Sequence, residues 1–222
     1  MNTIVRVLIE GDFACFSEVK TNRKSYPIIT PSAARNIIQA ICWKPAIRWE
    51  IHRVLLLNPI QYMTVKRNEV KGVIPLSKPS PVNVSDPSRR TQTVATILQN
   101  VAYVVEVEAV LTPKGLADGE QPQKFVAMLE RRLKKGQHYS TPYLGLREFT
   151  ANVSLANGQK PIDETRDLGE MFYDRFYPED AKWKDDPQDK KWSDSKPFFF
   201  DARLVKGILT VPTREKLMGE YA

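Results

Sequence analysis

The chain has 222 residues, of which 42% are hydrophobic and 27% are charged. This composition is typical of a globular protein and suffices for one large domain or two small ones. The net charge is +7 and is unevenly spread, because residues 163–194 carry −5 and the rest of the chain +12. A basic body favours a polyanionic partner, and nucleic acid is the commonest.

The sequence argues against a membrane protein, a disulfide-rich secreted protein and a metalloenzyme. It contains no run of about 18 apolar residues and no basic N-terminal region followed by an apolar stretch. Cys15 and Cys42 lack metal-ligand spacing, and no cluster of His, Asp and Glu indicates a metal site. We therefore expect a cytoplasmic protein with reduced thiols, no membrane contact, no metal and no cofactor.

The N-terminal part predicts a strand followed by a helix. Residues 4–9 are rich in β-branched side chains and Gly11 follows them, which indicates a short strand. Thr30 is a suitable N-cap, and Pro31 follows at the first helical position. Apolar residues then recur at helical spacing until Pro45 ends the pattern.

The middle of the chain predicts three more strands, a long excursion and a second helix. Residues 47–57 form an apolar, β-rich strand, and residues 101–111 form the clearest strand of all. Between them, residues 61–92 are basic and contain prolines. A loop of this length is usually functional or disordered, and the functional alternative is an excursion that grips a partner. Residues 122–135 predict a helix ended by a glycine, and residues 147–155 the last strand of this part.

The resulting order, β-α-β-β-α-β, indicates an α+β protein with a ferredoxin-like domain, the architecture also used by RNA-recognition modules. We assign this domain to residues 1–160 and a small antiparallel sheet domain to residues 161–222. Its expected strands are residues 168–177, 198–205 and 208–211, with a hairpin turn at Lys206-Gly207 and a charged, solvated loop at residues 178–197.

The second predicted helix has an apolar stripe and a basic stripe. The apolar stripe, which would seat the helix on a sheet, consists of Phe125, Leu129 and Leu133. The basic stripe consists of Lys124, Arg131 and Lys135, with Arg132 close by. These cations lead into the next loop and can position RNA through its phosphates. The alternative is a solvated helix end whose cations complement the helix dipole.

The loop after this helix carries the candidate catalytic groups. RNA cleavage by its own 2′-hydroxyl requires a base and an acid, and His138 can move a proton near neutral pH. Lys124 can stabilise the charge of the phosphorane, while Tyr139 and Tyr143 can stack bases or donate a hydroxyl. The alternative is that His138 is an ordinary surface residue. A metal-dependent nuclease is disfavoured.

Seven short motifs follow one another along nearly the whole chain. They are Gly11-Asp12-Phe13-Ala14-Cys15-Phe16, Pro31-Ser32-Ala33-Ala34-Arg35, Trp43-Lys44-Pro45-Ala46-Ile47-Arg48-Trp49, Asn58-Pro59-Ile60, Lys66-Arg67-Asn68-Glu69-Val70, Tyr143-Leu144-Gly145-Leu146-Arg147-Glu148-Phe149 and Arg166-Asp167-Leu168-Gly169. Together they resemble the type I-C (Dvulg) form of the fifth CRISPR-associated protein family. Their number and order make this resemblance far more specific than any single motif.

The resemblance implies a protein that cuts the CRISPR precursor transcript at the base of the repeat hairpin without metal and then retains the 5′ handle of the guide RNA. It implies a ferredoxin-like domain, a small C-terminal β-sheet domain and a place in the Cascade surveillance complex. There the protein would contact the backbone subunit and the large subunit, with a contact to target DNA possible in the assembled complex. The excursion at residues 61–92 would be a thumb-like region that meets guide RNA and the adjacent backbone subunit.

The chain departs from the family pattern at two positions. Family nucleases often carry Tyr or His immediately before the Trp-Lys-Pro motif, where this chain has Cys42. They often carry Lys-His where the second helix begins, where this chain has Lys124 and Phe125. Because Phe125 cannot move a proton, catalysis either relocates to His138, assisted by Lys124 and Tyr139, or is weak in this chain.

The sequence leaves three functions open. The leading hypothesis is an endoribonuclease that stays bound to its product as a Cascade subunit. The second is a catalytically weak or inactive subunit that binds the 5′ handle and supports assembly, and the third is a generic single-stranded RNA binder with strong salt dependence. The candidate RNA-binding residues are Arg35, Lys44, Arg67, Arg131, Arg132, Lys135 and Arg147 for the backbone and Tyr143 for stacking.

Overall fold

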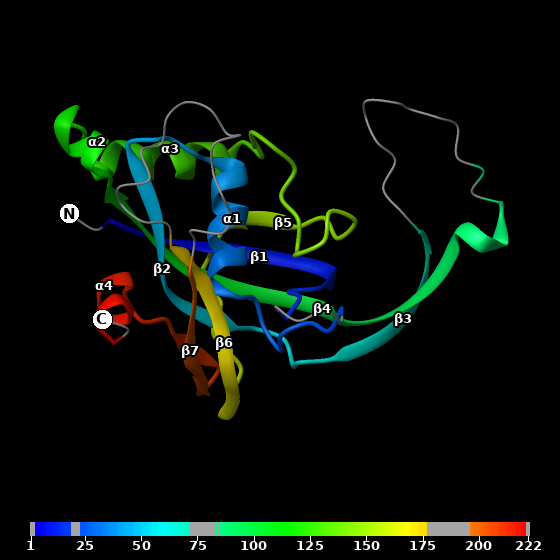
Figure 1. The fold of residues 1–222 in the computed structure, drawn as a ribbon. Coiled ribbons are helices and arrows are strands. Elements are labelled where there is room, and N and C mark those ends of the chain that lie inside the picture. The colour runs from blue at the N-terminus through cyan, green and yellow to red at the C-terminus, as the bar shows by residue number, and fades with distance from the viewer. Residues whose placement is uncertain (1–2, 19–22, 72–82, 84, 177–195, 221–222) are drawn as a thin grey trace.

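The structure is a computed structural model that describes residues 3–18, 23–71, 83, 85–176 and 196–220 (Figure 1). Its elements in chain order are β1 (Ile4–Ala14), α1 (Pro31–Ile41), β2 (Ile47–Leu56), β3 (Tyr62–Val70), the 3-10 helix Pro87–Arg89, β4 (Arg90–Leu111), α2 (Pro113–Ala117), α3 (Pro122–Lys134), β5 (Asn152–Leu155), β6 (Arg166–Phe176), β7 (Lys196–Val205), β8 (Ile208–Thr210) and α4 (Arg214–Glu220). The predicted mixed α+β class is confirmed.

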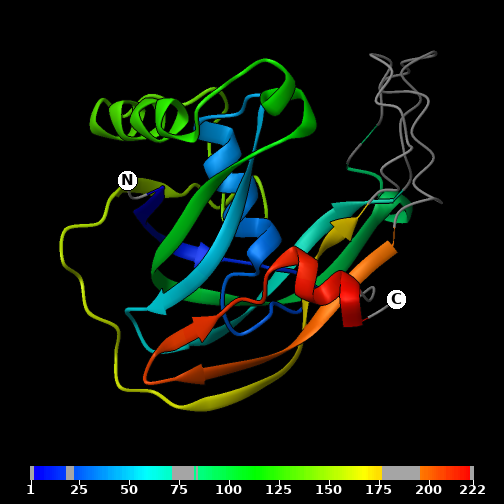
Figure 2. The same cartoon turned by 90° about the vertical axis from the view of Figure 1, so that its left-hand side faces the viewer.

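The strands form one antiparallel sheet in the order β5-β1-β4-β2-β8-β7-β6, and β3 pairs with the N-terminal half of β4. The long strand β4 lies between β1 and β2, and its residues from Val101 to Val107 are buried. Helices α1 and α3 contact each other and pack against this part of the sheet (Figures 1 and 2). The main core lies between them and the sheet.

The two predicted helices are confirmed, together with the residues that define them. The Thr30 side chain accepts a hydrogen bond from the Ala33 amide, and Pro31 occupies the first turn of α1. The buried positions of α3 are the predicted stripe, with Phe125 2%, Leu129 0% and Leu133 6% exposed. Phe125 is therefore a core residue.

Several strand boundaries differ from the prediction. β1 continues through Gly11 to Ala14, because Gly11 pairs with Val101 of β4. Only Asn152–Leu155 of the strand predicted at residues 147–155 is extended; the preceding residues belong to a loop. The short helices α2 and α4 were not predicted from the sequence.

The excursion predicted at residues 61–92 is largely an antiparallel hairpin. β3 pairs with β4 from Tyr62 opposite Leu98 to Val70 opposite Arg90, and the hairpin extends away from the helices (Figure 1). Residues 72–82 and 84 of the predicted excursion lie outside the described residues.

The strands predicted in the C-terminal part are confirmed, and so is their turn. Lys206 and Gly207 both have positive φ angles, 50° and 71°, as a tight hairpin requires. β8 pairs with β2, so these strands continue the main sheet, and the division into two domains stays a prediction. The solvated loop predicted at residues 178–197 lies mostly outside the described residues. No helix in the described part of the chain is long and apolar enough to cross a membrane.

Candidate functional site

The first half of the loop between α3 and β5 is docked on the C-terminal end of α1. The backbone amides of Tyr139 and Ser140 both donate to the carbonyl oxygen of Ala40, over 2.8 and 3.0 Å. The guanidinium of Arg132 donates to the carbonyl of the next residue, Ile41. The last carbonyls of a helix have no partner within the helix, so α3 and the loop supply the partners that α1 lacks.

The second half of the same loop is docked on the end of β1 and on β3. The Cys15 amide donates to the Leu144 carbonyl over 3.0 Å, and the Leu144 side chain is fully buried. Gly145 has a φ of +86°, and a Cβ atom there would lie 1.9 Å from the Cys15 carbonyl oxygen. Glu148 forms an ion pair with Arg67 of β3, whose Nη2 lies 2.9 Å from Oε2. These contacts fix the loop on both sides.

Between this loop and α1 lies an open cleft of about 490 Å³. Three exposed aromatic side chains line it: Trp43 is 57%, Tyr139 85% and Tyr143 41% exposed. Exposed aromatic rings are the usual platforms on which unpaired bases stack. Sequence reasoning missed Trp43 as a site residue, although an aromatic followed by Lys44 at a helix end is a readable signal.

Free cations gather at the edge of this region. Lys44 follows Trp43, while Arg131 and Lys135 stand at the end of α3, just before the loop, and all three side chains are exposed. Within the described residues none of the three forms a hydrogen bond or ion pair through its side chain. Arg147 of the loop is exposed and equally unpaired in that part of the chain. These four predicted RNA-binding residues can meet phosphates without first losing a partner.

Other predicted site residues are already engaged. Arg35 pairs with Asp174 of β6, with 2.9 Å between Nη2 and Oδ2, and Arg67 pairs with Glu148. Arg132 is part-buried through its bond to α1.

The structure separates Lys124 from the other proposed catalytic residues. Lys124 lies in the first turn of α3 and pairs with Glu120 over 2.7 Å. At about 1.5 Å of rise per residue, the helix places it about 15 Å from the C-terminal end that leads to His138. His138 and Tyr139 are exposed neighbours in the loop, and Tyr143 follows them.

Cys42 stands where family nucleases often have an ionisable ring, but it is fully buried. Burial raises the pKa of its thiol, more than the nearby charges of Arg132, Lys44 and Arg131 lower it. The Trp49 indole donates a hydrogen bond to the Cys42 carbonyl oxygen over 2.7 Å, so Trp49 further encloses Cys42. A protonated, enclosed thiol is no catalyst, so Cys42 packs the core.

No group of three or more His, Cys, Asp or Glu side chains in the described part of the chain is arranged to hold a metal ion. Metal independence of any activity stays a prediction.

Comparison with known proteins identifies the family. The sequence profile described as CRISPR-associated protein (Cas_Cas5) matches residues 4–212. Two curated proteins, each named CRISPR pre-crRNA endoribonuclease Cas5d, are similar over 219 residues: one from Mannheimia succiniciproducens is 40% identical and covers 94% of both chains, and one from Thermus thermophilus is 38% identical and covers 95% of this chain and 92% of its own.

A solved structure described as a CRISPR-associated protein has the same fold. It aligns with a TM-score of 0.67 at 23% identity, over 96% of this chain and 94% of its own. With the profile matching nearly the whole sequence, this chain belongs to the Cas5 family of CRISPR-associated proteins, as its seven motifs indicated.

Proposed function

We propose that this protein is an endoribonuclease that processes the CRISPR precursor RNA. The observation that carries the proposal is its 40% and 38% identity, over nearly complete chains, to two proteins named CRISPR pre-crRNA endoribonucleases. The cleft supports it, because exposed aromatic rings beside cations that are unpaired in the described part of the chain bind unpaired RNA.

We infer that residues 1–160 form a ferredoxin-like domain. The sheet order β5-β1-β4-β2 supports this assignment, since the strands of a β-α-β-β-α-β unit then lie in the order fourth, first, third, second. On this view the β3–β4 hairpin is an insertion between the second and third strands of the unit. Its projection from the body supports a role as the thumb-like region that meets guide RNA and a neighbouring backbone subunit.

The proposed chemistry is the attack of the RNA's own 2′-hydroxyl. A base removes the hydroxyl proton, the 2′-oxygen bonds to phosphorus, and the bond from phosphorus to the 5′-oxygen breaks as an acid protonates that oxygen. The products are a 2′,3′-cyclic phosphate and a 5′-hydroxyl. We assign a proton-transfer role to His138, with Tyr139 beside it. Lys135 and Arg131 lie closer in the chain to this loop than Lys124 and can stabilise the phosphorane charge.

After cleavage the protein would keep the 5′ handle and join the Cascade complex, in contact with the backbone and large subunits and within reach of target DNA. The second candidate function is the same subunit without efficient cleavage. The burial of Cys42 and Phe125, at the positions where family nucleases carry ionisable side chains, favours this alternative.

The deciding experiment is cleavage of a repeat-hairpin RNA in excess EDTA, with binding measured in parallel. We expect wild type to cut once, and His138→Ala to bind normally but cut about 10²- to 10⁴-fold more slowly. His52→Gln is the matched control, since His52 is the other of two histidines and pairs with Glu108 away from the cleft.

Each other outcome has a defined meaning. If wild type binds the hairpin tightly but leaves it whole, the protein is an assembly subunit. If Lys124→Ala stops cleavage and His138→Ala does not, the chemistry occurs at the opposite end of α3. If scrambled RNA competes as well as repeat RNA at fixed salt, the protein is a generic RNA binder.

A further inference from the structure

One side of α1 borders the cleft with small and amide side chains. The positions at this border, which recur three or four residues apart, are Ser32, Ala33, Asn36, Gln39 and Ala40. The opposite side of the helix is buried in the core through Ala34, Ile38 and Ile41, while Ile37 is buried between the two sides and also borders the cleft. Because Ser32, Ala33 and Ala40 are small, the amides of Asn36 and Gln39 are the main polar groups that α1 presents to a molecule bound in the cleft.

The amide of Gln39 is oriented by an arginine. Arg35 Nη1 donates to Gln39 Oε1 over 3.3 Å, and Arg35 Nη2 is held by Asp174 at 3.0 and 2.9 Å from its two carboxylate oxygens. Because a guanidinium only donates, the Gln39 oxygen must face Arg35, and the amide NH₂ remains as a donor for the cleft. Arg35 and Asp174, which lie outside the cleft, thus determine that the NH₂ group of Gln39 faces into it.

Asn36 offers the second amide. It is exposed, and in the described part of the chain its side chain makes no hydrogen bond. It therefore presents both an acceptor and a donor, the pair with which asparagine recognises the edge of a base.

The remaining walls suit a flat, aromatic occupant that belongs to a polyanion. Trp43, Tyr139 and Tyr143 expose their rings to the cleft. Lys44 directly follows Trp43 and Lys135 lies four residues before Tyr139, and neither side chain has a partner among the described residues. The cleft volume of about 490 Å³ falls within the range of small-molecule pockets. Stacking surface, edge-reading amides and flanking positive charge occur together where proteins hold unstacked nucleotides.

We propose that this cleft captures one unpaired nucleobase of the substrate RNA, stacked on the aromatic rings and read by the amides of Asn36 and Gln39. Arg35 acts as a positioning residue for Gln39 and not as a phosphate contact. The inference rests on the proposed function and deepens it, because it assigns the choice of RNA to the amides of α1 and not to the proton-transfer group His138 on the neighbouring loop.

The test uses repeat-hairpin RNAs in which each unpaired nucleotide beside the stem is replaced, one at a time, by an abasic unit. We expect one position at which wild type loses about tenfold in affinity, the scale of one stacked base. Trp43→Ala should lower affinity for the intact RNA by a similar factor and be insensitive to the abasic unit at that position. 2-Aminopurine placed there should be quenched on binding.

The amides are tested by base substitution at the same position. Asn36→Ala and Gln39→Ala should reduce the discrimination between bases, and Gln123→Ala on α3 is the matched amide control. Arg35→Ala should reproduce the altered preference of Gln39→Ala, with no further change in the double variant. A uniform loss of affinity for all bases would show instead that Arg35 contacts phosphate.

The inference and the proposed function fail in different ways. If wild type cuts the repeat hairpin and prefers it over scrambled RNA, but wild type and Trp43→Ala respond alike to every abasic position, the cleft holds no base and the proposed function stands. If the hairpin is bound no better than scrambled RNA, the proposed function is lost, and the inference with it.

Discussion

On the face of the sheet away from α1 and α3, arginine side chains are held by acidic neighbours, whereas the cations beside the cleft have no such partner among the residues that the structure describes. Glu106, only 6% exposed, lies between Arg6 and Arg53, whose Nε atoms are 3.4 and 2.6 Å from its oxygens. Further along β4, Glu108 pairs with His52 over 2.7 Å. Positive charge on this face is neutralised within the fold.

The difference indicates which surface meets RNA. RNA-recognition modules bind RNA on the open face of the sheet, through aromatic side chains. Here that face carries the ion pairs and a buried aliphatic cluster of Leu8, Leu55 and Val104. Three of the exposed aromatic rings, Trp43, Tyr139 and Tyr143, lie instead near the ends of α1 and α3, with cations that are unpaired in the described part of the chain. We therefore expect RNA affinity to reside there.

The largest effect should come from the loop that forms one wall of the cleft. In Gly145→Ala the new methyl would overlap the Cys15 carbonyl oxygen, since a Cβ would lie 1.9 Å from it at a φ of +86°. We expect the free energy of unfolding to fall by about 3 kcal/mol, as measured by urea unfolding. RNA binding, measured by fluorescence anisotropy, should be lost with it. Gly136→Ala is the control: its φ is +62°, but no atom lies within 4 Å of the added Cβ. In Gly136→Ala the backbone strain alone should lower the free energy of unfolding by about 1 kcal/mol. Equal losses in the two variants would show that Gly145 has no special role.

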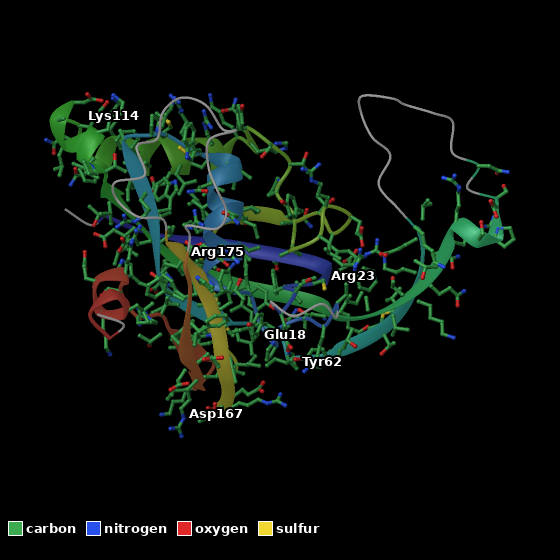
Figure 3. The ribbon with its side chains drawn as sticks, viewed as in Figure 1. Glu18, Arg23, Tyr62, Lys114, Asp167 and Arg175 are labelled. Carbon is green, nitrogen blue, oxygen red and sulfur yellow. The ribbon has the colours of Figure 1, made fainter. Side chains whose placement is uncertain are left out.

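A moderate effect should come from the free cations. Reversing Arg131 and Lys135 to Glu should weaken repeat-RNA binding at least tenfold and lower the slope of log affinity against log salt by about 1.4, or 0.7 per lost phosphate contact. The control is Lys114→Glu on α2, where the lysine pairs with Asp118 at the end of the molecule remote from Arg23 and the hairpin (Figure 3). If the salt slope of the double variant is unchanged, RNA binds at a different surface, and the open face of the sheet becomes a candidate.

The sequence predicted those parts of the fold that depend on local patterns. Thr30, Pro31 and the apolar spacing determine α1, and the stripe of α3 needs only its own residues. The β3–β4 hairpin escaped prediction because β3 buries little: its residues are exposed or half-buried throughout, so they lack an apolar alternation. Proline content and charge then indicated an irregular excursion.

The site was predictable in its motifs but not in its pairings. His138, Tyr139 and Tyr143 are brought together because they share one loop. The partners of Arg35 and Arg67 are 139 and 81 residues away in the chain, and no local pattern indicates such contacts. Two predicted phosphate contacts thus turned out to hold ion pairs with carboxylates, and the role of Gln39 emerged only from its bond to Arg35.

The smallest predicted effect concerns the neutralised face and its dependence on pH. The hydroxyl of Thr3, 2.7 Å from Glu108 Oε1, and then His52 hold the pKa of Glu108 below its usual 4.5. A carboxylate with a lowered folded pKa stabilises the protein above the unfolded value, and this contribution is lost as pH falls through the folded value. Glu108→Gln should therefore cost about 0.5 kcal/mol at pH 7, because the pair is partly exposed, and the difference from wild type should vanish in acid. Urea unfolding from pH 7 to pH 3 measures this difference in stability, with Glu10→Gln on β1 as the control.

If the difference in stability stays constant over this pH range, the carboxylate charge of Glu108 is not its source. If Glu108→Gln changes the RNA affinity, the sheet face is not neutral toward RNA.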